Sequence, residues 1–311
     1  YRLTVKTGLD NNYFYRIAKN KNIALIHAHF GFNGYKYIPL AQKLNVPLLV
    51  SFYGYDYDYL PNQNPKWVQK YQQLFSYAEA FICEGNHGRN KLIEKGCPKY
   101  KIYINHLGIS VQTIPFKKRE WKKGETLKLC QIASFDEKKG QEYTIKAFAK
   151  LLDYYSNAKL LLIGNGKNYS KLKQLVDELG ILGNVDFKES IPYSKLYEEL
   201  HCHHIFIHPS VIASDGDCEG GAPIILLDAQ ATGMPILSTF HCDIPEEVVD
   251  GKSGILVPEK DVESLTHAMQ VLIDNPELIQ KYGKYGRMHV ENNYDMIKCS
   301  QKLEEIYSAI L

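Results

Sequence analysis

The second half of the chain alternates short apolar runs with amphipathic segments, and this alternation restricts the possible folds more than any other feature. In the amphipathic segments QEYTIKAFAKLLDYY (141–155) and SKLKQLVDELG (170–180), apolar residues recur at intervals of three and four, which predicts helices. Nearly continuous apolar strands separated by helices predict a parallel sheet that is covered on both faces, in a Rossmann-like domain. The predicted strands are LKLCQIA (127–133), AKLLLIG (158–164), HIFIHPS (204–210) and PILST (235–239).

The first half repeats this pattern more loosely. Its predicted strands are NIALIHAHFG (22–31), VPLLVSFYG (46–54) and EAFICEG (79–85), and its predicted helices are YKYIPLAQKLN (35–45) and NHGRNKLIEKG (86–96). A complete doubly wound domain has about six strands, so we expect this first domain to be incomplete at its N-terminus.

The predicted domain limits follow from these patterns. We expect a first domain at 1–115, a linker at FKKREWKKGE (116–125) that opens a second domain at 116–293, and a final amphipathic helix at 294–311 that joins the first domain. A chain of 311 residues is long enough for two such domains.

Composition indicates a water-soluble protein. Hydrophobic residues make up 45% and charged residues 23%, no apolar run approaches the roughly 18 residues of a membrane span, and the N-terminus does not read as a signal peptide. These features predict a cytoplasmic location. Seven cysteines lie scattered without a C-x-x-C pair, so the sequence suggests neither a disulfide framework nor a zinc ribbon.

Charge is distributed unevenly. Residues 1–125 hold 19 Lys and Arg against 8 Asp and Glu, whereas residues 126–311 hold 18 against 27. The first half is therefore expected to face something anionic, such as phospholipid headgroups or a phosphorylated acceptor; the alternative is a solvated lysine-rich surface. Nucleic acid is not expected, because neither a zinc-finger nor an RNP pattern occurs.

Trp121 lies within the basic stretch 116–125. An indole among cations favours the interface of an anionic membrane, where each well-placed cation contributes about 1 kcal/mol. The stretch therefore predicts peripheral membrane contact, and the alternative is a solvated interdomain linker. The cations concerned are Lys117, Lys118, Arg119, Lys122 and Lys123.

The stretch CEGGAPIILLDAQATG (218–233) carries the clearest site chemistry. Pro223 suits the first position of a helix, because its missing N–H would have no partner there. The residues before it, Gly220 to Ala222, leave their backbone amides open, which predicts an anion site at the helix N-terminus. Glu219 and Asp228 are then expected to accept hydrogen bonds from sugar hydroxyls. The alternative is a helix cap by Glu219 and a surface position for Asp228.

Two glycine turns follow predicted strands. Lys139 precedes Gly140 in the first of them, where a lysine serves as a point charge for phosphates. Gly164 begins the second, GNGKNY (164–169), in which Tyr169 takes the place of the third glycine of a dinucleotide fingerprint. No metal site is predicted in HCHHIFIH (201–208), because no acid or cysteine completes a familiar ligand spacing. His208 at the end of this strand is within reach of the cleft, but a buried position with satisfied hydrogen bonds is favoured.

These residues resemble a known family. The stretch 215–261, DGDCEGGAPIILLDAQATGMPILSTFHCDIPEEVVDGKSGILVPEKD, is similar to the donor half of family 4 retaining glycosyltransferases with the GT-B fold, which include exopolysaccharide and lipopolysaccharide assembly enzymes. Further similar segments extend the resemblance over nearly the whole chain: IHAHFG, VPLLVSFYGYD, GCPKYKIYINHLGIS and LLLIGNGKN.

The resemblance implies a function. It implies two Rossmann-like domains that face each other across a cleft, a UDP- or GDP-linked sugar as donor, retention of anomeric configuration, and no required metal or cofactor. The implied acceptor is a saccharide or a lipid-linked molecule in cell-surface polysaccharide synthesis. Two alternatives remain open: a catalytically weak sugar-nucleotide-binding subunit, and an epimerase on the same architecture.

The resemblance also implies roles for single residues. Lys139 would meet the donor diphosphate, Glu219 the transferred sugar and Asp228 the ribose hydroxyls. The implied donor site comprises Ser134, Lys139, Gly164, Glu219, Gly220, Gly221, Ala222 and Asp228.

Several positions depart from the family pattern. Eight residues separate Glu219 from Asp228, one more than in the family, and the second acid is Asp rather than Glu. Ser134 replaces an arginine that would meet the diphosphate. Tyr53 replaces a histidine of the first domain, so Tyr53 and Asp56 are expected to orient the acceptor or the sugar.

Overall fold

The computed structural model describes residues 9–311 and contains two parallel sheets, each in its own compact unit. Unit 1 comprises Tyr1–His106 and Ser300–Leu311, and unit 2 comprises Leu107–Cys299. Residues 1–8 of the expected first domain lie outside the described residues. The domain limits expected from the sequence are 115 and 294, whereas the structure assigns 107–115 and 294–299 to unit 2.

The six-stranded sheet of unit 2 has the order β10-β9-β8-β5-β6-β7, with all strands parallel. The strand order reverses between the adjacent strands β5 and β8, as in a doubly wound nucleotide-binding fold. The predicted Rossmann-like domain is therefore confirmed. The strands are β5 (Leu127–Ile132), β6 (Ala158–Ile163), β7 (Val185–Lys188), β8 (Ile205–His208), β9 (Ile236–Thr239) and β10 (Gly254–Val257).

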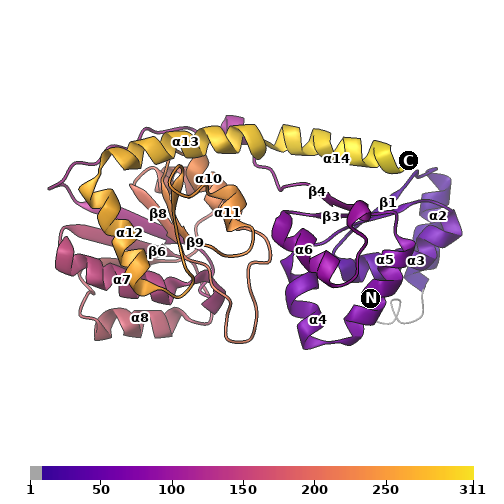
Figure 1. The fold of residues 1–311 in the computed structure, drawn as a ribbon, viewed down its shortest axis with the longest axis horizontal. Helices are drawn as coiled ribbons and strands as arrows, with labels where there is room; N and C mark the ends of the chain where they lie inside the picture. Colours follow the sequence, from indigo (N-terminus) through magenta and orange to yellow (C-terminus); the bar gives the residue numbers. More distant parts are fainter. Residues whose placement is uncertain (1–8) are drawn as a thin grey trace. The chain divides into compact units, whose positions relative to one another are not determined.

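Helices cover both faces of this sheet (Figure 1). On one face pack α7 (Gln141–Tyr154), α8 (Tyr169–Glu178) and α12 (Val262–Asp274). On the other pack α9 (Leu196–Leu200), α10 (Ile225–Ala231) and α11 (Ile244–Glu247), and α13 (Glu277–Asn293) packs against α10. Burial on both faces explains why the central strands are almost entirely apolar.

Two glycines allow the turns after β5 and β6 to approach neighbouring backbone. Gly140 has a φ of 69°, and a Cβ there would lie 1.9 Å from the carbonyl oxygen of Pro209. Gly164 has a φ of 151°, and a Cβ there would lie 1.9 Å from the carbonyl oxygen of Ala133. Any larger residue would push these turns apart, so both glycines fix the geometry at the carboxyl edge of the sheet.

Unit 1 contains a four-stranded parallel sheet in the order β1-β2-β3-β4. Its strands are β1 (Ile26–His29), β2 (Leu48–Ser51), β3 (Ala80–Cys83) and β4 (Ile102–Ile104). The helical segments are α2 (Leu9–Asn20), α3 (Gly31–Leu44), a π-helix (Tyr55–Tyr59), α4 (Leu60–Gln63), α5 (Lys66–Tyr77) and α6 (Asn86–Glu94).

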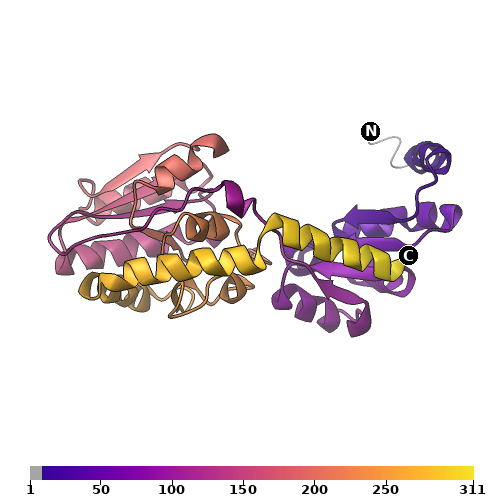
Figure 2. The ribbon, with the colours of Figure 1, turned by 90° about the horizontal axis from the view of Figure 1, so that it is seen from above.

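The two faces of this sheet bury different side chains. Val50 and Phe81 face a core that includes Phe52 and residues of α3 and α5. The opposite face is covered by α14 (Met296–Ile310), where Ile306 packs on Leu49, as Figure 2 shows for the helix as a whole. The predicted final helix thus forms, and its residues Ser300–Leu311 belong to unit 1.

The basic stretch 116–125 is neither a solvated linker nor a membrane-facing surface built around Trp121. Trp121 is only 3% exposed and belongs to the core of unit 2. The Arg119 guanidinium is also buried, and it donates to the carbonyl oxygens of Leu200, His203 and Thr232 at 3.0–3.1 Å. The predicted membrane contact through Trp121 and Arg119 is therefore wrong, because both side chains secure the stretch to unit 2.

The neighbouring lysines of this stretch do point outward: Lys117, Lys118, Lys122 and Lys123 are exposed. Within residues 9–311, every helix is too short or too polar to cross a lipid bilayer.

Candidate functional site

The carboxyl ends of β5 and β8 bring Lys139 and Glu219 together within unit 2. In an open α/β sheet, ligands bind outside the strand ends at the point where the strand order reverses. Lys139 follows β5 and Glu219 lies in the loop after β8, and the Nζ of Lys139 lies 2.6 Å from the Oε2 of Glu219. Their side chains are 17% and 6% exposed, so this is a nearly buried ion pair at the position that the fold reserves for ligands.

Glu219 has further partners. The Ser210 hydroxyl donates to its Oε1 at 2.8 Å, and the Nε2 of His208 lies 3.4 Å from the same oxygen. Burial on its own would raise the pKa of Glu219, but the hydrogen bond from His208 and the positive charge of Lys139 hold this pKa well below its usual range. Glu219 is therefore ionised at neutral pH. Its carboxylate points toward Lys139 and does not cap a helix. Glu219 takes this orientation although the loop before Asp228 is one residue longer than in the family pattern.

His208 is fully buried at the end of β8, and burial lowers its pKa. A neutral imidazole that donates from Nε2 to the Glu219 carboxylate fits this environment. The buried position of His208, favoured from the sequence, is thus observed, and His208 contacts the ion pair through Glu219.

The segment between Glu219 and α10 differs from the prediction. The helix begins at Ile225 and not at Pro223, because the carbonyl of Pro223 accepts from the N–H of Leu226 in a tighter turn that precedes the helix. Gly220 and Gly221 are buried, and the carbonyl of Gly221 accepts from the N–H of Asp243. The predicted place of Pro223 at the first helical position is therefore wrong by two residues.

A cavity of about 340 Å³ lies at the carboxyl ends of β5 and β6 in unit 2. Ser134 and Gly164, from the turns after β5 and β6, form part of its wall, and Asp228 lines it from α10. The remaining lining residues are mostly apolar: Ile132, Ala133, Ile163, Asn165, Ser190, Ile191, Tyr193, Leu196 and Ile225. A largely apolar pocket with a few convergent polar groups is typical of a small-molecule site.

Asp228 is only 3% exposed, so the surface position considered as an alternative is excluded. The hydroxyls of Tyr193 and Tyr197 each donate to its Oδ1 at 3.0 Å. Burial raises the pKa of Asp228, while these two hydrogen bonds oppose the rise. Asp228 therefore accepts two hydroxyl hydrogen bonds at one of its carboxylate oxygens, Oδ1.

In unit 1, His29 and Tyr53 meet at the carboxyl ends of β1 and β2. The Tyr53 hydroxyl and the Nδ1 of His29 lie 2.5 Å apart, and the two rings stack. His27 lies beside His29, with its Nδ1 2.8 Å from the Tyr307 hydroxyl and its Nε2 2.8 Å from the Ser51 hydroxyl. Burial, followed by the charge of His29, lowers the pKa of His27 to about 4.

Asp56 does not face this cluster as an open carboxylate. It is fully buried and accepts from the N–H of Gly31 at 2.5 Å and from the N–H of Tyr53 at 2.7 Å. Burial raises the pKa of Asp56 to about 8, against the lowering effect of these backbone donors. Asp56 thus joins the turn after β1 to the turn after β2 and positions Tyr53, so the structure favours an indirect role for it.

Several residues near the predicted site carried no sequence signal of their own. Tyr193 and Tyr197 follow β7, a strand that the sequence pattern does not predict, and only the fold brings them to Asp228. His29 ends the observed strand β1 and lies within the predicted strand 22–31, so its place at the carboxyl end of the strand is known only from the fold.

Two α/β units, each built on a parallel sheet, are the architecture of the GT-B glycosyltransferases. The family model Glycosyl transferases group 1 matches residues 113–289, and the model Glycosyltransferase Family 4 matches residues 6–113. The chain therefore belongs to the group 1, or family 4, glycosyltransferases.

Named relatives agree with this assignment. The putative colanic acid biosynthesis glycosyltransferase WcaL of Escherichia coli is 28% identical over 288 residues, which cover 91% of this chain and 70% of WcaL. The amylovoran biosynthesis glycosyltransferase AmsK of Erwinia amylovora is 28% identical over 286 residues, covering 89% of this chain and 68% of AmsK. The structure of Anabaena HepE in complex with UDP superposes with a TM-score of 0.82 at 15% identity, covering 96% of this chain and 82% of HepE.

Proposed function

We propose that this protein is a retaining glycosyltransferase that moves a sugar from a nucleoside-diphosphate sugar to a saccharide or lipid-linked acceptor in cell-surface polysaccharide synthesis. The observation that carries this proposal is that the Lys139–Glu219 pair and a cavity lined by Asp228 both lie at the carboxyl ends of the strands of unit 2. One cation and two separately held carboxylates match the three parts of such a donor: diphosphate, sugar and ribose. Catalysis would require no metal ion, because Lys139 supplies the positive charge for the leaving group.

The ion pair suggests how a donor would engage. Without donor, Lys139 and Glu219 neutralise each other at 2.6 Å. An arriving diphosphate competes for the Lys139 ammonium, and each separation of this pair frees Glu219 Oε2 to accept a sugar hydroxyl. Charge on the diphosphate grows as the glycosidic bond breaks, so Lys139 stabilises the transition state more than the bound donor.

Unit 1 offers features that suit an acceptor with an apolar part. A second cavity of about 480 Å³ lies between α2, β1 and α3, and its wall includes Phe14, Ile17 and Leu40. His27 and His29 also line it, so hydrogen-bonding groups stand at the edge of an apolar surface. This combination supports a lipid-linked acceptor, and the names of WcaL and AmsK support a role in exopolysaccharide synthesis.

Turnover with a panel of UDP- and GDP-sugars tests the proposal, with free saccharides and lipid-linked saccharides as separate acceptors. We expect transfer with one donor, and NMR of the product should show the donor's anomeric configuration. The Lys139→Ala variant should lose transfer, whereas Lys146→Ala, which removes a half-exposed lysine of α7, should retain it. Tight donor binding without any turnover would indicate the binding subunit instead, and isomerised sugar without acceptor would indicate the epimerase.

A further inference from the structure

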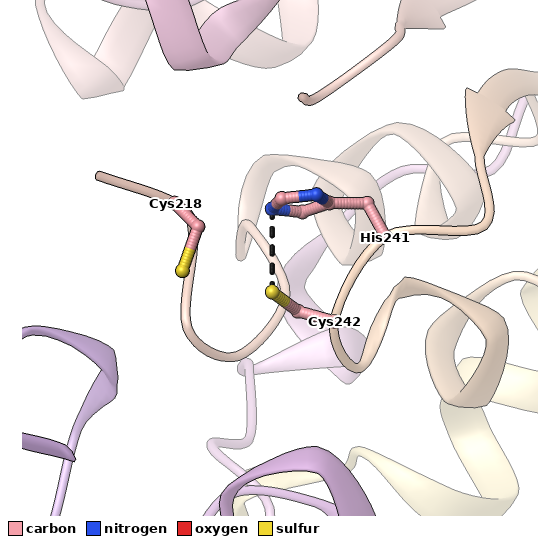
Figure 3. Close-up of side chains that lie close together, drawn as sticks. All are labelled: Cys218, His241 and Cys242. Atoms are coloured by element: carbon pink, nitrogen blue, oxygen red, sulfur yellow. Dashed lines mark hydrogen bonds between the residues drawn. The ribbon is translucent and has the colours of Figure 1, made fainter. Parts of the chain in front are cut away.

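Three potential metal ligands gather in unit 2 beside the donor residues. Cys218 lies in the loop after β8, and His241 and Cys242 follow β9. Their ligand atoms, two sulfurs and one imidazole nitrogen, all lie within 4.8 Å of one another. Figure 3 shows the His241 ring and the Cys242 thiol facing each other, with Cys218 alongside on its separate loop.

His241 is already oriented as a metal ligand. Its Nδ1 lies 2.7 Å from the Oε1 of Glu259, so Nδ1 carries the proton and donates to the carboxylate. Its Nε2 then presents a lone pair, which accepts from the backbone N–H of Glu219 at 3.1 Å. A carboxylate that holds the far N–H of an imidazole is the arrangement that orients zinc-binding histidines and increases their basicity.

The distances suit Zn²⁺. In a tetrahedral site with bonds of about 2.0–2.3 Å, neighbouring ligand atoms lie about 3.3–3.8 Å apart. The Cys242 sulfur and the His241 Nε2 are already 3.3 Å apart. Since the greatest separation is 4.8 Å, side-chain movements of about 1 Å complete the set. Cys242 is partly exposed, which leaves a route for the ion.

The backbone adds a further observation. Cys242 has a φ of 45°, in the left-handed region that few residues other than glycine adopt. Such conformations persist where the surrounding structure enforces them, and they cluster at ligand sites.

We propose that Cys218, His241 and Cys242 bind one Zn²⁺ ion, with water at the fourth position. The two thiols lose their protons to solvent on binding, because thiolates are the ligand form of cysteine. The ion takes the Nε2 lone pair from the Glu219 N–H, and this displaces the residue that holds Lys139. Zn²⁺ therefore weakens donor binding, a consequence that rests on the proposed function, whereas the metal site itself does not.

Titration of the whole protein with Co²⁺, under a phosphine reductant, tests the site directly. We expect one equivalent to bind with a thiolate-to-cobalt charge-transfer absorption and the intense visible bands of tetrahedral cobalt, and Zn²⁺ should displace both signals. A wild-type spectrum without thiolate charge transfer would overturn the proposal.

Matched cysteine variants locate the ligands. Cys218→Ser and Cys242→Ser should each reduce the charge-transfer absorption and lower Zn²⁺ affinity, measured by competition with a colorimetric chelator. Glu259→Gln should lower that affinity about 10- to 100-fold, as expected for a ligand-orienting partner. The control is Cys202→Ser, which changes an exposed thiol outside the cluster. Thermal midpoints identify a variant that fails to fold, and wild-type cobalt spectra in both cluster variants would refute the assignment.

A final arm tests the link to the donor site. Saturating Zn²⁺ should weaken binding of the UDP-sugar donor about tenfold in wild-type protein, within the usual range of coupling between sites, and should not alter donor binding to Cys242→Ser. Equal UDP-sugar affinity with and without Zn²⁺ would refute the coupling while the cobalt result stands. Failure to bind any nucleotide, with the cobalt spectrum intact, would instead count against the proposed function.

Discussion

The two units place different chemistry at the same part of the same kind of sheet. At the carboxyl edge of unit 2, Lys139 and Glu219 form a nearly buried pair of full charges. At the carboxyl edge of unit 1, His27 is held neutral and Asp56 has a pKa raised to about 8. A parallel sheet offers a ligand position at this edge but does not determine its charge. The loops decide whether this edge carries full charges, as in unit 2, or uncharged groups, as in unit 1.

Removal of the cation in unit 2 should have the largest effect. Lys139→Ala should lower kcat about 100- to 1000-fold, the usual loss when a group that stabilises developing charge is removed from a buried site. Steady-state kinetics with the preferred donor measure this effect, with Lys146→Ala as the control. Because Lys139 contacts Glu219, the free-energy loss of transition-state stabilisation in the Lys139→Ala, Glu219→Ala double variant should be smaller than the sum of the losses in the two single variants. An unchanged kcat would show that the charge of Lys139 does not take part in the reaction, so the charge difference between the two units would have no catalytic meaning.

The next effect concerns the stability of unit 1. Asp56→Ala leaves the backbone donors of Gly31 and Tyr53 without their acceptor, which should cost about 2–5 kcal/mol of unfolding free energy. Hydrogen exchange of the β1 and β2 amides measures this loss within unit 1, and the β5 and β6 amides serve as the internal control. Asp56→Asn keeps the size and one acceptor oxygen, so its loss should be smaller. Full protection of β1 in Asp56→Ala would show that Asp56 does not join the two turns.

The two carboxylates of unit 2 should divide the donor between them. Asp228→Ala should weaken binding of the bare nucleoside diphosphate about 10-fold, the loss expected for one or two hydrogen bonds to a charged group. Glu219→Ala should leave that affinity nearly intact and weaken only the sugar-linked donor. Calorimetry with UDP and with a UDP-sugar separates the two roles, and equal losses for bare UDP would refute the division.

The smallest expected effect is a pH dependence in unit 1. The folded pKa of His27 is about 4, below its ordinary value of 6.5, so the unfolded chain binds more protons between these values. Stability is therefore fully present above pH 6.5 and falls as the pH drops toward 4. Because His27 is only partly buried, we expect about 1 kcal/mol. Hydrogen exchange of β1 at pH 7 and pH 5 measures the change.

A control variant tests whether His27 causes this pH dependence. His27→Gln preserves hydrogen-bonding capacity toward Ser51 and Tyr307 but cannot titrate. The pH difference in β1 protection should shrink in this variant relative to wild type. If it persists undiminished, other groups cause it.

Local pattern predicted much of the fold. The apolar runs from Leu127 and from Ala158 became β5 and β6 within one residue of their expected ends, because a strand buried on both faces must be apolar along its length. β7 and β10 were not predicted from the strand pattern, because four residues such as VDFK are too few to establish a period. The pattern of residue types also predicted Lys139, Glu219 and Asp228 as site residues, but it did not predict their contacts.

Only the tertiary structure decided how those residues meet. Lys139 and Glu219 are far apart in sequence, and they pair because β5 and β8 are adjacent strands whose carboxyl ends share an edge. The same long-range packing buries Trp121, which its lysine-rich neighbourhood predicted to be exposed. Periodicity reports which face of a segment is apolar, but not which segment will cover it. The residue types of the site were therefore determined by the sequence alone, whereas their partners, burial and charge states depended on the strand order of the folded sheet.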